Sequence, residues 1–278
     1  MTQPWIAPFA RWFAETDPRG EGRLDVGRLN AFAAARGLRL EDGAPVRFVA
    51  ARERADAPYE SVIAATGTVP TRVEGPGMLH DWFNALCWLR WPAIKARMNR
   101  LQATAIREAT AKTAGAPRGP LRDAVTLFDE SGALFVTVDE QVVARWRGFD
   151  WNGLFVAGRS RFQRRVRVFV VGHALLEKLL APYKGVCAHA LLAAPTSGAA
   201  APMAAAGIAP AGSLDALDAL DALDRRVAAG LDAGTLAPDR LTPLPLLGIP
   251  GWWPGNEDPA FYNDPAVFRA RRHRRSRS

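Results

Sequence analysis

The densest interleaving of apolar and polar side chains in this sequence lies between His80 and Gln102. Residues 79–90 are predicted to form a helix because large apolar side chains share one face, namely Trp82, Phe83, Leu86 and Leu89. Pro92 suits the first turn of a second helix. That helix carries a polar row that fits either a solvated face or part of a polar site, made of Lys95, Asn99 and Gln102. We therefore expect two consecutive helices, each with a core face and an amide-bearing face.

Strand and helix signals alternate in the middle of the chain. Apolar runs on both sides of residues 129–132 predict a β-hairpin whose turn reads Asp-Glu-Ser-Gly. Arginine alternates with valine from Arg164 to Val171, which predicts a strand with one solvated face. Gly172 ends this strand, and a helix is expected from His173 to Leu180. Residues 186–192 are short and apolar, as is typical of a buried strand or helix.

The last third of the chain changes composition twice. Residues 193–212 consist mostly of Ala, Pro, Gly and Ser, which indicates a linker or an extended arm. A Leu-Asp-Ala repeat follows Ser213, and we interpret it as a surface helix without chemistry that begins at this N-cap. Residues 243–268 are too rich in Pro and Gly for regular structure, yet too aromatic to remain in water. They are therefore expected to form an irregular strap on the core.

Together these patterns predict an α+β fold, in which a small, mostly antiparallel sheet packs against several helices and an irregular aromatic C-terminal strap. The expected organisation is an α+β core domain over residues 1–193 and an Ala/Pro/Gly-rich linker over 194–213. A helix and the aromatic strap, residues 214–268, are expected to pack back on the core, followed by a disordered arginine-rich tail over 269–278.

Composition narrows the class of protein. The apolar fraction of 49% and the charged fraction of 23% are ordinary for a soluble globular protein. The formal net charge is +8, but residues 269–278 contribute six arginines and no acid, so the basicity is concentrated in this tail. The N-terminal stretch does not resemble a secretory signal, and no apolar run reaches membrane-spanning length. With two distant cysteines, Cys87 and Cys187, we expect a cytoplasmic protein with neither a disulfide scaffold nor a membrane partner.

Histidines are the first candidates for chemistry. His80 and His173 each begin a predicted helix, where the helix dipole favours a neutral ring. A neutral imidazole is what a general base or a metal ligand requires. His173 and Glu177 are four residues apart and so share a helix face. His80 and His173 could equally serve only as helix caps, and His189, in an apolar run, could be a core histidine.

If these residues converge, the protein is a hydrolase that uses either a divalent metal or acid and base groups on a small-molecule or phosphate-containing substrate. The predicted catalytic set is His80, Asp81, Asn84, His173 and Glu177. The predicted metal ligands are His80, His173, His189 and Glu177. Asp129 and Glu130 could add carboxylates, although both are also typical of a turn before Gly132. The spacings match no named metal or nucleotide motif.

Two other function classes remain open. Arginines surround the predicted strand near residue 165 with aromatic residues between them, a mixture typical of proteins that bind RNA or single-stranded nucleic acid. The named contacts would be Arg165, Arg167 and Trp146, and the arginine-rich tail would add binding to phosphates. Alternating arginines are also typical of a solvated sheet face. A noncatalytic, partner-binding protein would require only the aromatic strap and a groove.

Five separated motifs, in this order, resemble the bacterial family catalogued as domain of unknown function 3025. They occupy residues 66–72, 80–99, 122–132, 171–183 and 243–268. The resemblance spans Pro58 to Phe268, whereas the Ala-rich segment, the Leu-Asp-Ala repeat and the arginine-rich tail look like features of this chain alone. It implies no particular activity.

Overall fold

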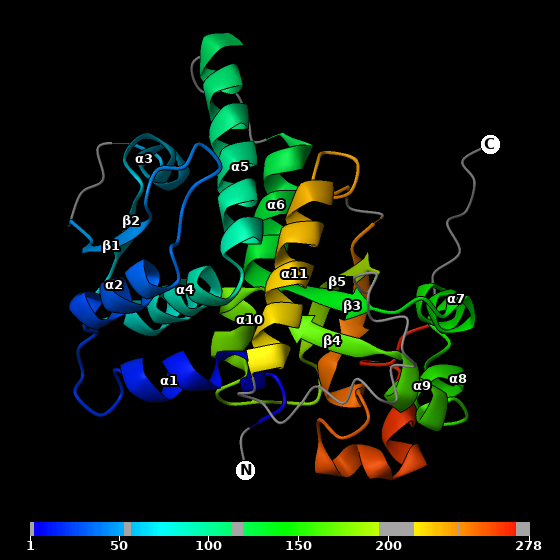
Figure 1. Ribbon diagram of the computed structural model, residues 1–278. Coiled ribbons are helices and arrows are strands. Elements are labelled where there is room, and N and C mark those ends of the chain that lie inside the picture. Colours follow the sequence, from blue (N-terminus) through cyan, green and yellow to red (C-terminus); the bar gives the residue numbers. More distant parts are fainter. Residues whose placement is uncertain (1–2, 53–56, 113–118, 195–213, 238–239, 271–278) are drawn as a thin grey trace.

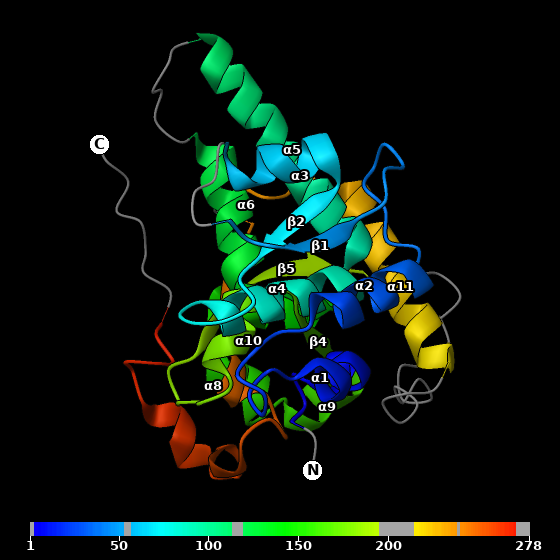
Figure 2. The ribbon, with the colours of Figure 1, turned by 90° about the vertical axis from the view of Figure 1, so that its left-hand side faces the viewer.

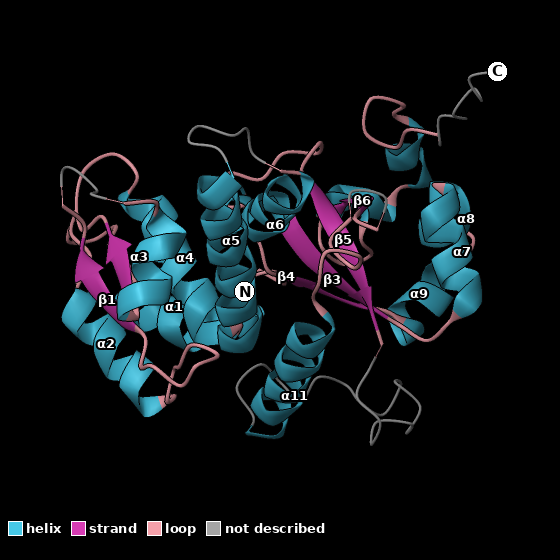
Figure 3. Ribbon diagram, turned by 90° about the horizontal axis from the view of Figure 1, so that it is seen from above, coloured by secondary structure: helices cyan, strands magenta, loops and turns pink. Residues whose placement is uncertain are grey.

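The computed structural model describes residues 3–52, 57–112, 119–194, 214–237 and 240–270. The fold is α+β, as the sequence predicts, with one two-stranded and one four-stranded sheet among these residues. The small sheet and the N-terminal helices lie on one side of α5 and α6, and the four-stranded sheet lies on the other (Figure 3). Most of the predicted linker and of the arginine-rich tail falls outside the described residues.

The N-terminal part surrounds a pair of parallel strands, β1 and β2, that lies between helices α3 and α4 (Figure 2). Its elements are η1 (Ala7–Phe9), α1 (Ala10–Thr16), α2 (Val26–Ala35), β1 (Arg47–Ala50), α3 (Tyr59–Thr66), β2 (Thr68–Thr71) and α4 (Met78–Arg90). A buried hydrogen bond of 2.9 Å from Trp82 Nε1 to Thr16 Oγ1 joins α4 to α1. Helix α4 is therefore a central element of the core, with most of its residues buried.

The rest of the chain builds the four-stranded sheet and the helices around it (Figure 1). Its helices are α5 (Pro92–Lys112), α6 (Pro120–Ser131), α7 (Glu140–Gly148), α8 (Trp151–Phe155), α9 (Arg159–Arg165), α10 (His173–Lys178) and α11 (Leu214–Gly230). Its strands are β3 (Gly132–Val136), β4 (Arg167–Val170), β5 (Cys187–Ala193) and β6 (Thr242–Pro245). The strand order is β4-β3-β5-β6, in which β3 and β5 are parallel and the other two pairs are antiparallel.

The predicted hairpin around residues 129–132 is wrong, because residues 120–131 form helix α6 rather than a strand. Pro120 stands in the first turn of this helix, where its missing N–H costs no hydrogen bond. Ala124, Val125 and Phe128 are buried at helical spacing against the sheet. Only the second apolar run, β3, is a strand, and all five of its residues are buried. Asp129 and Glu130 therefore lie in the last turn of a helix.

The predicted strand from Arg164 to Val171 is too long. Helix α9 extends to Arg165, and β4 begins only at Arg167. Arg164 and Arg165 are in the last turn of α9, where a positive charge interacts favourably with the helix dipole. The alternating arginines and valines therefore belong to two different elements, α9 and β4.

The C-terminal strap packs on the core as predicted, but it contributes one element that the sequence did not indicate. Residues 242–245 form the edge strand β6, where proline is tolerated because one side of the strand has no partner. Beyond it lie the short helices η2 (Leu246–Gly248), η3 (Pro254–Glu257) and η4 (Pro259–Asn263). Asn256 is fully buried and donates to the carbonyls of Leu247 and Ile249 at 2.8 and 2.7 Å. These bonds, which lie within the strap, hold its irregular segments together.

The Leu-Asp-Ala helix, α11, does more than cover the surface, contrary to the prediction. Two of its repeat aspartates, Asp221 and Asp224, are three residues apart and share one face. Asp221 pairs with Arg90 and with Arg36, the latter at 2.8 Å. Asp224 accepts hydrogen bonds from the first backbone amides of α5, those of Ala93 and Ile94, at 2.9 and 3.0 Å. Burial raises the pKa of Asp224 to about 6. Asp224 therefore docks α11 onto the start of α5, and Asp221 docks it onto the ends of α2 and α4.

A close backbone contact joins the start of α10 to the end of α6. The amides of Val171 and Gly172 both donate to the carbonyl of Gly132, each at 2.9 Å. A Cβ atom at Gly172 would lie 2.5 Å from both the carbonyl oxygen of Glu130 and the amide nitrogen of Gly132. Only glycine permits this approach, which sets His173 beside Glu130.

We predict that Gly172→Ala lowers the free energy of unfolding by about 1–3 kcal/mol, because the added methyl group meets backbone atoms that cannot rotate away. Chemical denaturation measures the effect. Gly148→Ala is the matched control, since a Cβ there has open space and alanine favours a helix. Equal unfolding midpoints for the Gly172→Ala variant and the parent protein would contradict this account of the contact.

Candidate functional site

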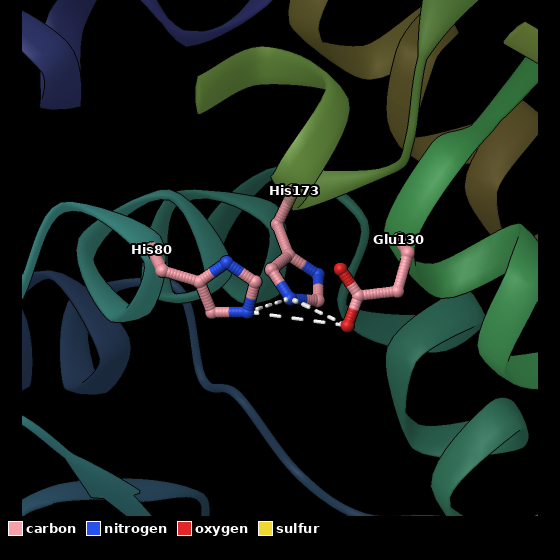
Figure 4. Close-up of side chains that lie close together, drawn as sticks. All are labelled: His80, Glu130 and His173. Carbon is pink, nitrogen blue, oxygen red and sulfur yellow. Dashed lines mark hydrogen bonds and ion pairs between the residues drawn. The ribbon is translucent and has the colours of Figure 1, made fainter. Parts of the chain in front are cut away.

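Three side chains from three helices meet at one point of the described structure (Figure 4). They are His80 of α4, Glu130 of α6 and His173 of α10, and their candidate ligand atoms all lie within 4.8 Å of one another. We call them the His–His–Glu cluster. Of the His, Cys, Asp and Glu side chains in the described ranges, these three alone form a group with the spacing of a metal site.

The backbone before each histidine fixes its position. Helix α4 begins after Gly77, whose φ of 89° lies in the left-handed region that favours glycine. His80 follows in the first turn of this helix. His173 is the first residue of α10 and follows the close contact at Gly172. Glu130 is the next-to-last residue of α6. The cluster therefore forms where two helices begin and a third ends.

The distances within the cluster are short. Nε2 of His173 lies 3.0 Å from Nε2 of His80. Oε1 of Glu130 lies 3.7 Å from the first of these nitrogens and 3.9 Å from the second. The His173 side chain is only 6% exposed, whereas those of His80 and Glu130 are 29% and 38% exposed. The cluster is therefore closed behind His173 and open to solvent at His80 and Glu130.

A carboxylate stands behind each imidazole ring. Oε2 of Glu177 lies 3.1 Å from Nδ1 of His80. Oδ2 of Asp129 lies 3.9 Å from Nδ1 of His173, too far for a hydrogen bond, so this buried nitrogen faces a negative charge without being bonded to it. A carboxylate at Nδ1 favours the tautomer that carries its proton there, which leaves Nε2 with a lone pair. The two lone pairs then face each other across 3.0 Å, an arrangement that calls for a cation or a proton near both nitrogens.

Burial and neighbouring charges set the protonation states. Burial lowers the pKa of His173 to about 4; the negative charge of Asp129 opposes this shift, and the positive charge of Lys95 adds to it. Burial raises the pKa of Glu130. Burial also opposes ionisation of Asp129, but the charge and hydrogen bond of Lys95 together with the neighbouring histidines outweigh it, so the pKa of Asp129 is lowered. At neutral pH the site therefore combines a neutral His173 with an ionised Asp129.

The polar row of α5 is buried and is not a solvated face, and its first residue, Lys95, supports the site from within the core. Lys95, Asn99 and Gln102 are each no more than 7% exposed. The ammonium group of Lys95 donates to Oδ1 of Asn84 at 2.8 Å and to Oδ1 of Asp129. Asn84 in turn donates through Nδ2 to the hydroxyl of Tyr59 at 2.7 Å. A buried positive charge thus holds both the carboxylate behind His173 and a side chain on the face of α4 that carries His80.

The structure brings together only part of the predicted catalytic set. His80 and His173 lie in the cluster, and Glu177 contacts His80. Asn84 belongs to the Lys95 network and has no contact with the cluster nitrogens among the described interactions. Asp81 points to Arg72, from which it accepts three hydrogen bonds of 2.6, 2.9 and 2.7 Å. Asp81 therefore fixes the loop before α4.

The structure assigns two carboxylates and one histidine to roles that differ from the predicted ones. His189 lies on β5, paired with Gly132, and burial lowers its pKa, but it is not part of the cluster. The hairpin prediction makes Asp129 and Glu130 turn residues, whereas the structure places them in the last turn of α6. The helical spacing of Val125 and Phe128 with Leu121 is the signal that would have placed both carboxylates at a helix end.

Of the residues named for nucleic-acid binding, Trp146 does not lie on the surface. Trp146 is fully buried, and its ring stacks on Phe135 with centroids 4.1 Å apart, so it is not accessible to a base. Arg165 ends α9, whereas Arg167 donates to the backbone carbonyls of Gln163 and Val166, each at 2.8 Å. Residues 271–278 of the arginine-rich tail lie outside the described residues, so binding through the tail stays a prediction.

A family model described as Protein of unknown function (DUF3025) matches residues 46–272, most of the chain, including the whole cluster. Neither the curated proteins nor the solved structures contain a significant match. Across the part of the chain that the structure describes, no helix has both the length and the apolar character needed to cross a bilayer. The family match confirms the resemblance drawn from the sequence motifs.

We predict that the metal-free protein loses stability as the pH falls from about 6.5 to about 4. The native pKa of His173 lies near 4, below the ordinary value of 6.5, so the unfolded chain takes up this proton first. The loss reaches about 3 kcal/mol when both states are protonated. Denaturation at a series of pH values in EDTA should show that the parent and His173→Asn converge in stability toward pH 4. A constant difference across this range would contradict the burial of a neutral His173.

Proposed function

The chain belongs to the DUF3025 family, and for this chain we propose a divalent-metal-dependent hydrolase whose centre is the His–His–Glu cluster. One observation carries the proposal. Nε2 of His80 and Nε2 of His173 lie 3.0 Å apart, and each ring has a carboxylate at its other nitrogen. Such carboxylates are the usual second partners of metal-binding histidines, because they fix the tautomer and raise the basicity of the ligand.

The geometry fits a small divalent ion. Bonds of about 2.0–2.2 Å in a tetrahedral site place ligand atoms about 3.3–3.5 Å apart. The three distances in the cluster, 3.0, 3.7 and 3.9 Å, lie on both sides of this range. Two histidines and one carboxylate are the ligand set of several catalytic zinc sites, whose fourth position holds water. The solvent exposure of His80 and Glu130 gives water and substrate a route to that position.

The bound ion would lower the pKa of its water to about 7 and so supply a hydroxide nucleophile at neutral pH. The residues of the chain then have separate roles. Glu177 holds the ring of His80 with Nε2 directed at the centre, and the negative charge of Asp129 faces Nδ1 of His173. The buried Lys95 keeps Asp129 ionised and in place. The substrate would be a small molecule with a hydrolysable acyl or phosphoryl bond.

Proton transfer between the two histidines without a metal is the acid/base version of the same proposal. It uses the same 3.0 Å contact, with one shared proton in place of the ion. Metal content separates the two versions. Both free cysteines, Cys87 and Cys187, support a reducing compartment, and we propose the cytoplasm.

We predict that purified protein binds one Zn²⁺ or Co²⁺ per chain, measured by elemental analysis and by calorimetric titration of the metal-free protein. His173→Gln and Glu130→Gln each remove one ligand and should abolish or strongly weaken binding. Glu177→Gln removes only the partner of His80 and should weaken binding about 10–100-fold.

His189→Gln is the matched control, because this histidine lies outside the cluster and its loss should leave metal affinity unchanged. Hydrolysis of nitrophenyl ester and nitrophenyl phosphate probes, with and without added metal, then tests the reaction class. Equal metal affinity in all four variants, or none in the parent protein, would refute the metal centre. Metal-independent hydrolysis lost in His173→Gln would favour the acid/base version.

A further inference from the structure

Hydrogen bonds connect Lys95 through Asn84 to Tyr59, and the donor and acceptor of each bond can be assigned. An ammonium group has donors and no acceptor, so the atom of Asn84 that faces Lys95 at 2.8 Å must be the amide oxygen. The amide nitrogen of Asn84 therefore faces the Tyr59 hydroxyl, to which it donates at 2.7 Å. Because the phenol oxygen already accepts this bond, its own proton is free to be donated to another group.

Tyr59 is also close to the cluster and accessible to a ligand. It is the first residue of α3, and its side chain is bonded to Asn84, one helical turn after His80 on the same face of α4. The residue is 38% exposed, one of four large hydrophobic or aromatic residues among the described ranges that are at least 36% exposed. Its hydroxyl makes no second hydrogen bond within the described structure, so an incoming group can supply the acceptor.

We propose that Tyr59 is a further catalytic residue, which donates a hydrogen bond to the carbonyl or phosphoryl oxygen of a substrate bound at the His–His–Glu cluster. This inference rests on the proposed metal centre. Lys95 and Asn84 are its positioning residues, since they orient the phenol and do not touch the substrate.

The electrostatic environment keeps the phenol a donor. Partial burial raises the pKa of Tyr59, and the negative charge of Asp129 raises it further, against the opposing hydrogen bond from Asn84. The phenol therefore stays protonated at neutral pH, as an oxyanion-stabilising donor must. Removal of one such donor from a hydrolytic site lowers kcat about 10²–10³-fold in a known case.

Two chains of polar contacts, here called arms, connect the ammonium group of Lys95 to the site. The first arm runs through Asp129 to the buried side of His173, and the second runs through Asn84 to Tyr59. The same ammonium group would thereby position a metal ligand and a substrate donor. The first arm ends at the cluster, and the second ends at Tyr59, whose partner Asn84 lies one helical turn from His80 on α4.

The test uses the full chain loaded with Co²⁺, whose visible spectrum reports the ligands of the ion. Acetohydroxamate, a small metal-binding carbonyl compound, is the probe. We predict that Tyr59→Phe weakens acetohydroxamate binding about 10-fold or more, the effect of losing a hydrogen bond to a charged group. The Co²⁺ affinity and the spectrum without the probe should stay unchanged, since Tyr59 is not a ligand. Asn84→Ala should weaken probe binding less, because the phenol remains but loses its orientation.

Tyr183→Phe is the matched control, since this tyrosine is 58% exposed and lies in the segment between α10 and β5. Equal probe affinity in the Tyr59→Phe and Tyr183→Phe variants, with Co²⁺ bound in both, would overturn the role of Tyr59 and leave the metal centre standing. No Co²⁺ binding by the parent protein would overturn both proposals. A cobalt form of the parent that does not bind acetohydroxamate would also overturn the inference, because no substrate oxygen could then approach beside Tyr59.

Discussion

The ion pair between Lys95 and Asp129 is the interaction on which the arrangement of this site depends. Lys95 is only 4% exposed, and an unpaired ammonium group at this depth would be strongly destabilising. Asp129 supplies the opposite charge from α6, and Asn84 supplies a second acceptor from α4. Three helices are therefore held together by one cation. Since buried ion pairs add little net stability, the pair is better explained by the geometry that it imposes on the site.

Charged and polar groups are arranged in the same way around the two histidine rings. Carboxylates stand behind both rings, so the two Nε2 lone pairs converge on a space that is buried on the side of His173 and open toward solvent at His80 and Glu130. The backbone contact at Gly172 supports the same arrangement, because it brings the first residue of α10 against the last turn of α6. Rigid elements thus position each ligand, as a preorganised centre requires.

The two regular patterns in the sequence, the alternating arginines and the Leu-Asp-Ala repeat, did not reveal the structural roles of their side chains. The alternating arginines belong partly to the end of a helix, where they complement its dipole. The Leu-Asp-Ala repeat looked like surface sequence, yet Asp224 is 2% exposed and caps α5, the helix that carries Lys95. Helix α11 therefore stabilises the start of the element that supports the site. In both segments the tertiary partner, rather than the local pattern, decided the role of the side chains.

The sequence by itself determined the two long helices around Pro92, the helix that begins at His173 and the α+β class, because helical spacing of apolar residues and Gly and Pro signals are local. It also placed His80, His173 and Glu177 together as candidates. Only the tertiary structure decided that Glu130 joins the histidines while Asp81 turns to Arg72 and His189 lies apart. These outcomes depend on contacts between residues about 9 to 100 positions apart, and local spacing does not encode which carboxylate meets which ring.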